Sequence, residues 1–240
     1  MTQLSNNFNA VPVDEVFFSY QGEGIFAGIP QIFVRFSGCN LKCNYCDTKT
    51  SLKINKKTKY YSKQSLYYLI ADVYRQNKRF FYSKKPSVSF TGGEPLLYAD
   101  YMIELLKKLK AKGFEIYLET NGTLSGQLSK ILDLCGIVSM DIKFKSACGK
   151  DLLLQHKKFL NQAAKKSFVK TVITKSTTAD EFKKAVKLVS DISRDIKFVI
   201  QPSDNEKTVN KKVFEFYALA SSKLKDVRIL PQLHKIWKIR

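Results

Sequence analysis

Three cysteines, Cys39, Cys43 and Cys46, form the pattern Cys-x3-Cys-x2-Cys in a polar stretch of the 240-residue chain. Thiolates at this spacing can surround one metal centre. A closed zinc site needs a fourth protein ligand, and the other cysteines and histidines show no paired spacing that would supply one. A thioredoxin-like Cys-x2-Cys pair would not need Cys39. The pattern therefore favours a [4Fe-4S] cluster with one iron left open for a small molecule, since such clusters are otherwise usually held by four cysteines.

A glycine-rich element, Gly92-Gly93-Glu94-Pro95, follows a stretch that is typical of a buried strand. Its two glycines allow another backbone to approach closely, and the carboxylate of Glu94 suits a bound ammonium group. Alone, this element would be an ordinary turn. One helix and one strand separate it from the cysteines, so both features are expected at strand ends.

Apolar, β-branched stretches predict seven strands, with amphipathic segments between them. The predicted strands are Gln31–Phe36, Ser87–Thr91, Phe114–Glu119, Ile137–Ile142, Phe168–Ile173, Ile196–Gln201 and Val227–Leu230. Strand–helix alternation in one chain predicts an α/β fold with a mostly parallel sheet and covering helices. Seven such strands fit a partial TIM-type barrel in a single domain, residues 1–240. Sites in such folds collect at the carboxyl ends of the strands.

Bulk composition excludes several classes of protein. No run of about 18 apolar residues occurs, which excludes a membrane-spanning helix, and the N-terminal residues lack the basic start and apolar core of a secretory signal. Five cysteines, an odd number with three crowded together, argue against a disulfide framework. We therefore expect a soluble, cytoplasmic chain in which Cys135 is buried and Cys148 is a free thiol.

The chain is strongly basic, with 41 Lys and Arg against 21 Asp and Glu and a formal net charge of +20. Such a charge indicates either an anionic partner or a lysine-rich solvated surface. The lysines are spread along the whole chain, which favours the solvated surface, and His156 in a lysine-rich stretch is expected to be solvated too. A basic, cluster-bearing RNA-binding module would predict salt-sensitive RNA affinity. Because no aromatic and basic RNA motif is present, we expect no direct nucleic-acid binding.

The cysteine pattern, with Tyr45 just before its last cysteine, resembles the signature of the radical S-adenosylmethionine (SAM) superfamily. The resemblance implies a [4Fe-4S] cluster whose open iron binds the amino and carboxylate groups of the methionine moiety. It also implies reductive cleavage of SAM to a 5′-deoxyadenosyl radical, in a modified barrel of the radical SAM kind. Gly92-Gly93-Glu94-Pro95 resembles the superfamily element that contacts the methionine amino group.

The flanking segments resemble the 7-carboxy-7-deazaguanine synthase family along the full chain. The motifs that carry this resemblance are Phe18-Ser19-Tyr20-Gln21-Gly22-Glu23-Gly24, Gly28-Ile29-Pro30, Phe33-Val34-Arg35, Gly38-Cys39-Asn40-Leu41, Cys46-Asp47-Thr48 and Leu230-Pro231-Gln232-Leu233-His234-Lys235. They imply a homodimeric, magnesium-dependent lyase that converts 6-carboxy-5,6,7,8-tetrahydropterin to 7-carboxy-7-deazaguanine with loss of ammonia, for queuosine or archaeosine precursors. A glycyl-radical-activating enzyme is the alternative within the superfamily, but it does not call for the first and last of these motifs.

The resemblance also implies roles for individual residues. It implies that Cys39, Cys43 and Cys46 hold the cluster and that Thr48 binds Mg²⁺, a hard oxygen ligand for a hard cation. The implied SAM contacts are Tyr45, Cys46, Asp47, Gly93, Glu94, Gln201, Pro202, Ser203 and Asp204. The implied pterin contacts are Tyr20, Gln21, Gly22, Glu23, Arg35, Thr91, His234 and Arg240.

Elementary chemistry agrees with several of these roles. An amide and a carboxylate at Gln21 and Glu23 can read the donors and acceptors of a guanine-like edge. Arg35 is a charge in an apolar strand and needs a partner there, and its planar guanidinium suits the substrate carboxylate.

One segment departs from the family pattern. Where many relatives have Ser-Pro-Lys, this chain has Ser139-Met140-Asp141-Ile142-Lys143. Ser139, Asp141 and Lys143 therefore all remain candidates for contact with SAM. For the net positive charge we hypothesise docking of an acidic electron donor such as flavodoxin, which electrostatic steering would accelerate at low salt.

Overall fold

Nine strands form one sheet in the part of the chain that the computed structural model describes, residues 9–56, 58–82, 85–203 and 211–239. The strands are β1 (Ala10–Tyr20), β2 (Pro30–Phe36), β3 (Lys59–Ser62), β4 (Ser87–Gly92), β5 (Glu115–Thr120), β6 (Ile137–Asp141), β7 (Ser167–Ile173), β8 (Phe198–Pro202) and β9 (Val227–Ile229). Their order is β3-β1-β2-β4-β5-β6-β7-β8-β9. All pairs from β2 to β9 are parallel, whereas β1 is antiparallel to both of its neighbours. The sheet is not closed, which confirms the predicted partial barrel.

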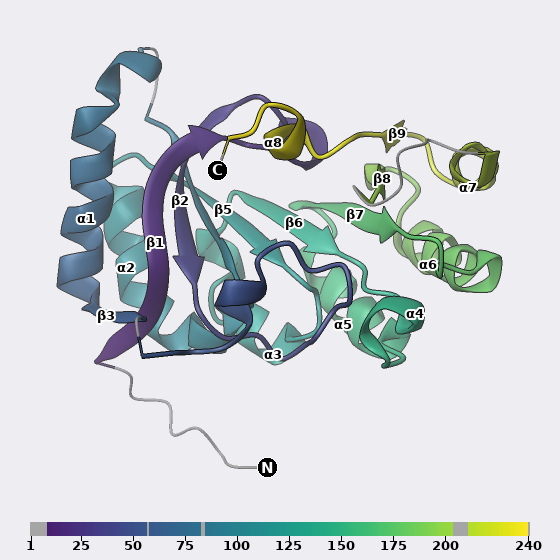
Figure 1. The fold of residues 1–240 in the computed structure, drawn as a ribbon, viewed down its shortest axis with the longest axis horizontal. Coiled ribbons are helices and arrows are strands. Elements are labelled where there is room, and N and C mark those ends of the chain that lie inside the picture. The colour runs from purple at the N-terminus through teal and green to yellow at the C-terminus, as the bar shows by residue number, and fades with distance from the viewer. Residues whose placement is uncertain (1–8, 57, 83–84, 204–210, 240) are drawn as a thin grey trace.

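The covering helices alternate with the parallel strands along the chain. The helices are α1 (Lys63–Gln76), α2 (Ala99–Ala111), α3 (Ser125–Leu128), α4 (Lys145–Cys148), α5 (Leu153–Ala163), α6 (Ala179–Ile192), α7 (Lys211–Ser221) and α8 (Leu233–Ile236). Figure 1 shows the sheet curving from β1 to β9, with α1, α2, α5, α6 and α7 along its outer side and α8 beside the end of β1. None of the helices formed by the described residues has both the length and the apolar content needed to cross a membrane.

All seven predicted strands are present, with ends shifted by at most two residues. Strands β1 and β3 were not predicted from the sequence. In β1, Pro12 and the acidic pair Asp14-Glu15 interrupt the apolar alternation, and the register shifts between Val13 and Glu15. In β3, most side chains are exposed, so the strand carries no apolar signal.

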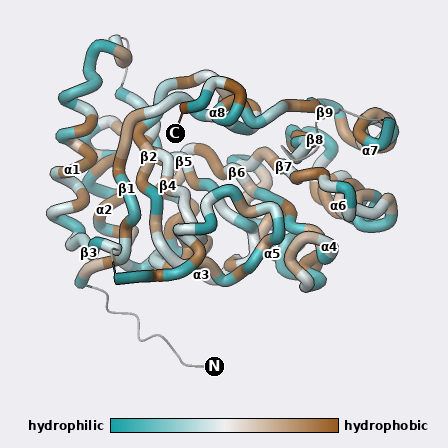
Figure 2. Tube along the Cα trace, viewed as in Figure 1, coloured by the Kyte–Doolittle hydropathy of each residue, from teal (hydrophilic) through white to brown (hydrophobic). Residues whose placement is uncertain are grey.

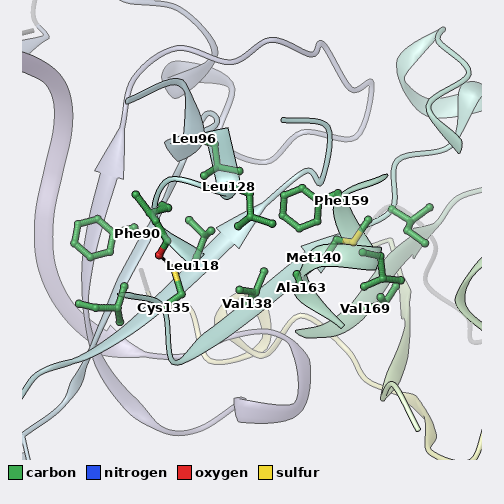
Figure 3. Packing of buried hydrophobic residues seen from close by; sticks show 14 of the residues in the cluster. Phe90, Leu96, Leu118, Leu128, Cys135, Val138, Met140, Phe159, Ala163 and Val169 are labelled. Atoms are coloured by element: carbon green, nitrogen blue, oxygen red, sulfur yellow. Dashed lines mark hydrogen bonds between the residues drawn. The ribbon is translucent and has the colours of Figure 1, made fainter. Parts of the chain in front are cut away.

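The core lies between the outer helices and the sheet. The central parallel strands bury residues on both faces, and each carries several apolar residues. Figure 3 shows this packing: Phe90, Leu118, Val138, Met140 and Val169 come from adjacent strands, and helical side chains such as that of Phe159 pack against them. Figure 2 shows hydrophobic residues recurring along the central strands and hydrophilic ones on the outer turns of α1.

Candidate active site

One cavity of about 420 Å³ lies at the carboxyl ends of the parallel strands. It brings together most of the residues that the sequence singled out. The lining includes Tyr20, Gln21, Gly22, Glu23, Arg35, Cys39, Cys43, Tyr45, Cys46, Asp47, Thr48, Thr91, Gly93, Ser139, Asp141, Lys143, Gln201, Ser203 and His234. Among the predicted residues that the structure describes, Glu94 and Pro202 do not line it. Asp204 and Arg240 lie outside the described residues.

The three cysteines follow β2 on one irregular loop and are free thiols. The backbone N–H of Leu41 donates to Cys39 Sγ at 3.5 Å, and Asn121 Nδ2 lies 4.0 Å from the same sulfur. Burial raises the pKa of the Cys39 thiol, and it raises the pKa of Cys43 to about 11 despite the nearby charge of Lys143. The thiols of Cys39 and Cys43 are therefore protonated at neutral pH unless a metal binds them.

The Gly-Gly-Glu element joins the cysteine loop to the sheet. Glu94 N–H donates to Gly38 O at 2.9 Å, and a Cβ on Gly93 would lie 1.9 Å from that oxygen. Glu94 is fully buried, and its carboxylate accepts hydrogen bonds from Leu96 N, Thr120 Oγ1 and Asn121 N. Burial raises its pKa to about 7. In the structure Glu94 ties the end of β4 to the end of β5, and its contact with a ligand ammonium stays a prediction.

Gln21 is anchored by a carboxylate that the sequence analysis did not single out. Gln21 Nε2 donates to Glu119 Oε1 at 2.8 Å and to Gln31 Oε1 at 3.1 Å. Thr91 Oγ1 donates to Glu119 Oε2 at 2.7 Å. Glu119 also lines the cavity. These bonds hold two predicted pterin contacts, Gln21 and Thr91, on one carboxylate.

Charges of alternating sign cross the cavity. Lys143 Nζ lies 2.8 Å from Asp141 Oδ2, and Lys170 Nζ lies 2.6 Å from the same oxygen and 2.8 Å from Glu23 Oε2. Burial would raise the pKa of both carboxyl groups, but the neighbouring lysines outweigh it and hold both pKa values below their usual range. Both carboxyl groups are therefore ionised at neutral pH, and two cations balance two anions.

The segment around α8 closes one side of the cavity. Gln232 Nε2 donates to Glu23 Oε1 at 2.6 Å and to Asp47 Oδ2 at 3.3 Å, and His234 Nε2 lies 3.4 Å from Asp47 Oδ2. Burial alone would lower the pKa of His234, but its hydrogen bond to Asp47 and the charge of Glu23 raise it. The ligand atoms of Glu23, Asp47 and His234 lie within 4.8 Å of one another. Thr48 follows Asp47 in the sequence and lines the same cavity.

Arg35 has the anionic partner that a charge in an apolar strand requires. Its Nε lies 2.8 Å from Glu15 Oε1, and its guanidinium carbon lies 5.3 Å from the centre of the Phe17 ring. This ion pair crosses β1 and β2, which the register pairs at these two residues. The guanidinium is therefore fixed at the cavity wall.

Gln201 and Asp141 carry buried polar atoms without partners. Gln201 is fully buried, and neither its Oε1 nor its Nε2 has a hydrogen-bond partner in the described structure; the same holds for Asp141 Oδ1. Buried polar groups are normally satisfied. Both side chains line the cavity, so a polar ligand there would satisfy them.

The solvated position expected for His156 is wrong. His156 lies on the buried face of α5, is 0% exposed, and its Nε2 lies 3.1 Å from Asn121 O. Its lysine neighbours occupy the solvent face of the same helix, because residues one apart do not share a helix face. Cys135 is buried and Cys148 is a free thiol, as predicted.

Glu119 and Lys170 were not among the predicted site residues, although both line the cavity. A signal was present, because each is a charged residue in an apolar strand, the same anomaly that singled out Arg35. Gln232 lies within a quoted motif but had no assigned role. Its two contacts to Glu23 and Asp47 depend on the chain fold and have no local signature.

An open parallel sheet with three cysteines at its carboxyl edge defines a class of protein. A model of the radical SAM superfamily matches residues 33–211, and the chain belongs to that superfamily. The 7-carboxy-7-deazaguanine synthase of Geobacter sulfurreducens is 34% identical, over 93% of this chain and 95% of the relative. That of Archaeoglobus fulgidus is 36% identical, over 94% and 97%. Within the superfamily, the chain belongs to the 7-carboxy-7-deazaguanine synthase family.

The fold agrees with this family. The crystal structure of QueE from Escherichia coli superposes with a TM-score of 0.65 and covers 94% of this chain and 95% of that one, at 22% identity. Family membership implies a [4Fe-4S] cluster, SAM and Mg²⁺. The residues present fit these groups: three thiols on one loop suit a cluster with one open iron, and the unpartnered polar atoms of Gln201 and Asp141 suit a polar ligand beside it.

Proposed function

We propose that this chain converts 6-carboxy-5,6,7,8-tetrahydropterin to 7-carboxy-7-deazaguanine with loss of ammonia. One observation carries the proposal: the three cysteines share a single cavity with Gln21, Glu23 and Arg35. The amide and the carboxylate complement the adjacent donors and acceptors of a pterin edge. The guanidinium suits the substrate carboxylate, with which it can form two parallel hydrogen bonds.

The same cavity offers residues for the cofactors. In the proposal, Cys39, Cys43 and Cys46 bind the cluster, which supplies the electron for cleavage of SAM. Lys143 and the unpartnered oxygen of Asp141 would bind the carboxylate and amino groups of SAM. Gln201 would satisfy its buried amide on the adenosyl part, where an amide can both donate and accept.

Magnesium is proposed at Thr48, beside the predicted substrate groups. Thr48 lines both the main cavity and a neighbouring one, and Asp47 next to it adds a second hard oxygen. A cation there would offset the charge of the substrate carboxylate. The ionised Asp47, whose pKa is held low by the hydrogen bond to His234 despite burial, supports binding of a cation.

The test is anaerobic reconstitution with iron and sulfide, followed by incubation with SAM, reductant, Mg²⁺ and the carboxypterin. The wild-type protein should release ammonia and form the deazaguanine acid. Cys43→Ser should lose the cluster absorbance and all turnover. Cys148→Ser, a free thiol outside the cavity lining, is the matched control and should keep both.

The outcomes separate the superfamily from the family. Cluster formation and SAM cleavage without conversion of the pterin would overturn the proposed substrate and favour a different radical enzyme, such as a glycyl-radical-activating one. A protein that binds zinc or no metal under these conditions would overturn the whole proposal.

We also propose a homodimer located in the cytoplasm. Ile29, Ile236 and Trp237 are exposed apolar side chains. Ile29 and Trp237 belong to one region, since a Cβ on Gly28 would meet the Trp237 ring at 3.9 Å. Sedimentation should give twice the mass of one chain, and Trp237→Glu should lower it. An unchanged monomeric mass for the wild type would refute the dimer.

An acidic electron donor such as flavodoxin is proposed as the reductant partner. The formal net charge of +20 supports this proposal, because opposite charges accelerate encounter at low ionic strength. The rate of cluster reduction should fall as salt rises. A rate that does not change with ionic strength would contradict it.

A further inference from the structure

Lys170 is a buried cation in an otherwise apolar strand. It lies in the middle of β7, and its side chain is only 10% exposed. Neither the motifs nor the family resemblance gives it a role. Burying an ammonium group is costly unless it is paired, so its position needs an explanation beyond packing.

The two carboxylate partners of Lys170 belong to the two ligand subsites of the proposed function, the SAM side and the pterin side. Asp141 is its register partner on the adjacent strand β6, at 2.6 Å, and belongs to the segment proposed for SAM. Glu23 lies in the segment after β1, at 2.8 Å, and belongs to the motif proposed for the pterin. One ammonium group therefore holds a carboxylate from each side.

Each carboxylate keeps a second protein partner and spare acceptor capacity. Asp141 also binds Lys143, and its Oδ1 has no partner among the described residues. Glu23 also accepts a hydrogen bond from Gln232. Because an ionised carboxylate has about four acceptor positions, both can contact a ligand while Lys170 stays bound to them.

We propose that Lys170 is a positioning residue that couples the binding of the pterin to the binding of SAM. The inference rests on the proposed function, which assigns Glu23 to the pterin and Asp141 to SAM. A ligand that fixes one carboxylate fixes the shared ammonium group, and this orients the other carboxylate. Coupling of this kind is reciprocal, so each ligand tightens the binding of the other by the same factor.

Charge balance points in the same direction. Lys143, Asp141, Lys170 and Glu23 sum to zero, and both proposed ligands bring a carboxylate into the cavity. Without Lys170, two anions would face one cation. The carboxylate of the pterin would then meet an excess of negative charge, and the SAM side and the pterin side would lose their connection.

The test measures the affinity for SAM with and without the carboxypterin, on the anaerobically reconstituted holoenzyme. In the wild type, SAM should bind more tightly when the pterin is present. Lys170→Met should weaken pterin binding about 30-fold, the scale of losing one partner of a buried charge pair. In this variant the ratio of the two SAM dissociation constants should approach one. Lys170→Arg, which keeps the charge, should restore part of the ratio.

A surface substitution provides the matched control. Lys187 is 75% exposed and pairs with Asp191 on its own helix, so Lys187→Met should keep the wild-type ratio. Lys170→Gln keeps a donor but loses the charge, and it replaces the Met variant if that variant does not fold.

The outcomes distinguish the two proposals. A wild-type ratio in Lys170→Met or Lys170→Gln overturns the coupling role. A wild-type enzyme that binds SAM but not the pterin overturns the proposed function instead. A change in turnover with an unchanged ratio of the SAM dissociation constants would also overturn the coupling role, because coupling requires that ratio to change.

Discussion

Gly93 is the point at which three chain segments meet, and replacing it with alanine tests how the cysteine loop is held. A Cβ there would lie 1.9 Å from Gly38 O and 2.8 Å from Ser51 O. Both are backbone atoms, so no side chain can rotate away. The same oxygen of Gly38 accepts the N–H of Glu94 at 2.9 Å, and Ser51 O accepts the N–H of Gly38 at 2.8 Å.

The expected size of the effect follows from this geometry. To bring the Cβ contact to 3.0 Å, the end of β4 and the cysteine loop must separate by at least about 1 Å, which breaks the Glu94–Gly38 hydrogen bond. Overpacking costs about 1 to 3 kcal/mol, and an unsatisfied buried backbone group costs about 1 to 3 kcal/mol more. We expect Gly93→Ala to lose about 3 to 5 kcal/mol, or roughly 10 °C in melting temperature for a chain of this size.

Thermal unfolding and iron content after reconstitution provide the assay. Gly93→Ala should melt earlier and bind less iron, because the loop that bears Cys39 is displaced. Gly126→Ala is the matched control: nothing lies within 4 Å of the added Cβ, and the residue is in α3. Alanine there should stabilise by about 0.5 to 1 kcal/mol. A Gly93→Ala protein that melts within 2 °C of the wild type with full iron would refute this reasoning.

Three further predictions concern single side chains. Burial lowers the pKa of His156 to about 4, below the 6.5 of an exposed histidine, so the unfolded state binds more protons than the folded state between these pH values. The free energy of unfolding should therefore fall by about 2 kcal/mol from pH 7 to pH 5. In urea unfolding, His156→Gln should remove this loss. Thr178 and Glu181 form a capping box on α6, so Thr178→Ala should lower the free energy of unfolding by about 1 kcal/mol, measured by chemical denaturation; an unchanged midpoint would contradict it. Arg35→Lys should raise KM for the pterin about tenfold in steady-state assays, whereas an unchanged KM would exclude Arg35 from substrate binding.

The sequence predicted those parts of the fold and site that have local signatures. The parallel strands were recognisable because burial on both faces makes them rich in apolar and β-branched residues. The cysteine loop was recognisable because three cysteines at this spacing can surround one metal centre. Gly93 was recognisable because glycine allows another backbone to approach closely. Each feature can be recognised within a stretch of about ten residues, so no knowledge of the tertiary fold was needed.

Features that depend on distant segments were not predictable in this way. Glu94 has the residue type of a ligand contact, but its three hydrogen-bond donors, from β5 and its own turn, draw its carboxylate out of the cavity lining. His156 was misjudged because its lysine neighbours in sequence occupy a different helix face. Lys170 belongs to no motif, because its role depends on contact with Glu23, which is far from it in the sequence.

Because the sheet is open, the last described segment of the chain covers one side of the cavity. In a closed barrel the last strand pairs with the first, but here β9 and β3 are the two edges of the sheet. The segment that includes α8 follows β9 and contacts the residues after β1. Leu233 N–H donates to Gly22 O at 2.8 Å, and Gln232 contacts both Glu23 and Asp47. The opening that the missing closure leaves is thus covered by polar side chains instead of by a strand. This segment presents an amide and an imidazole at the groups proposed to bind the substrate. The incomplete barrel therefore contributes directly to the chemistry of the site.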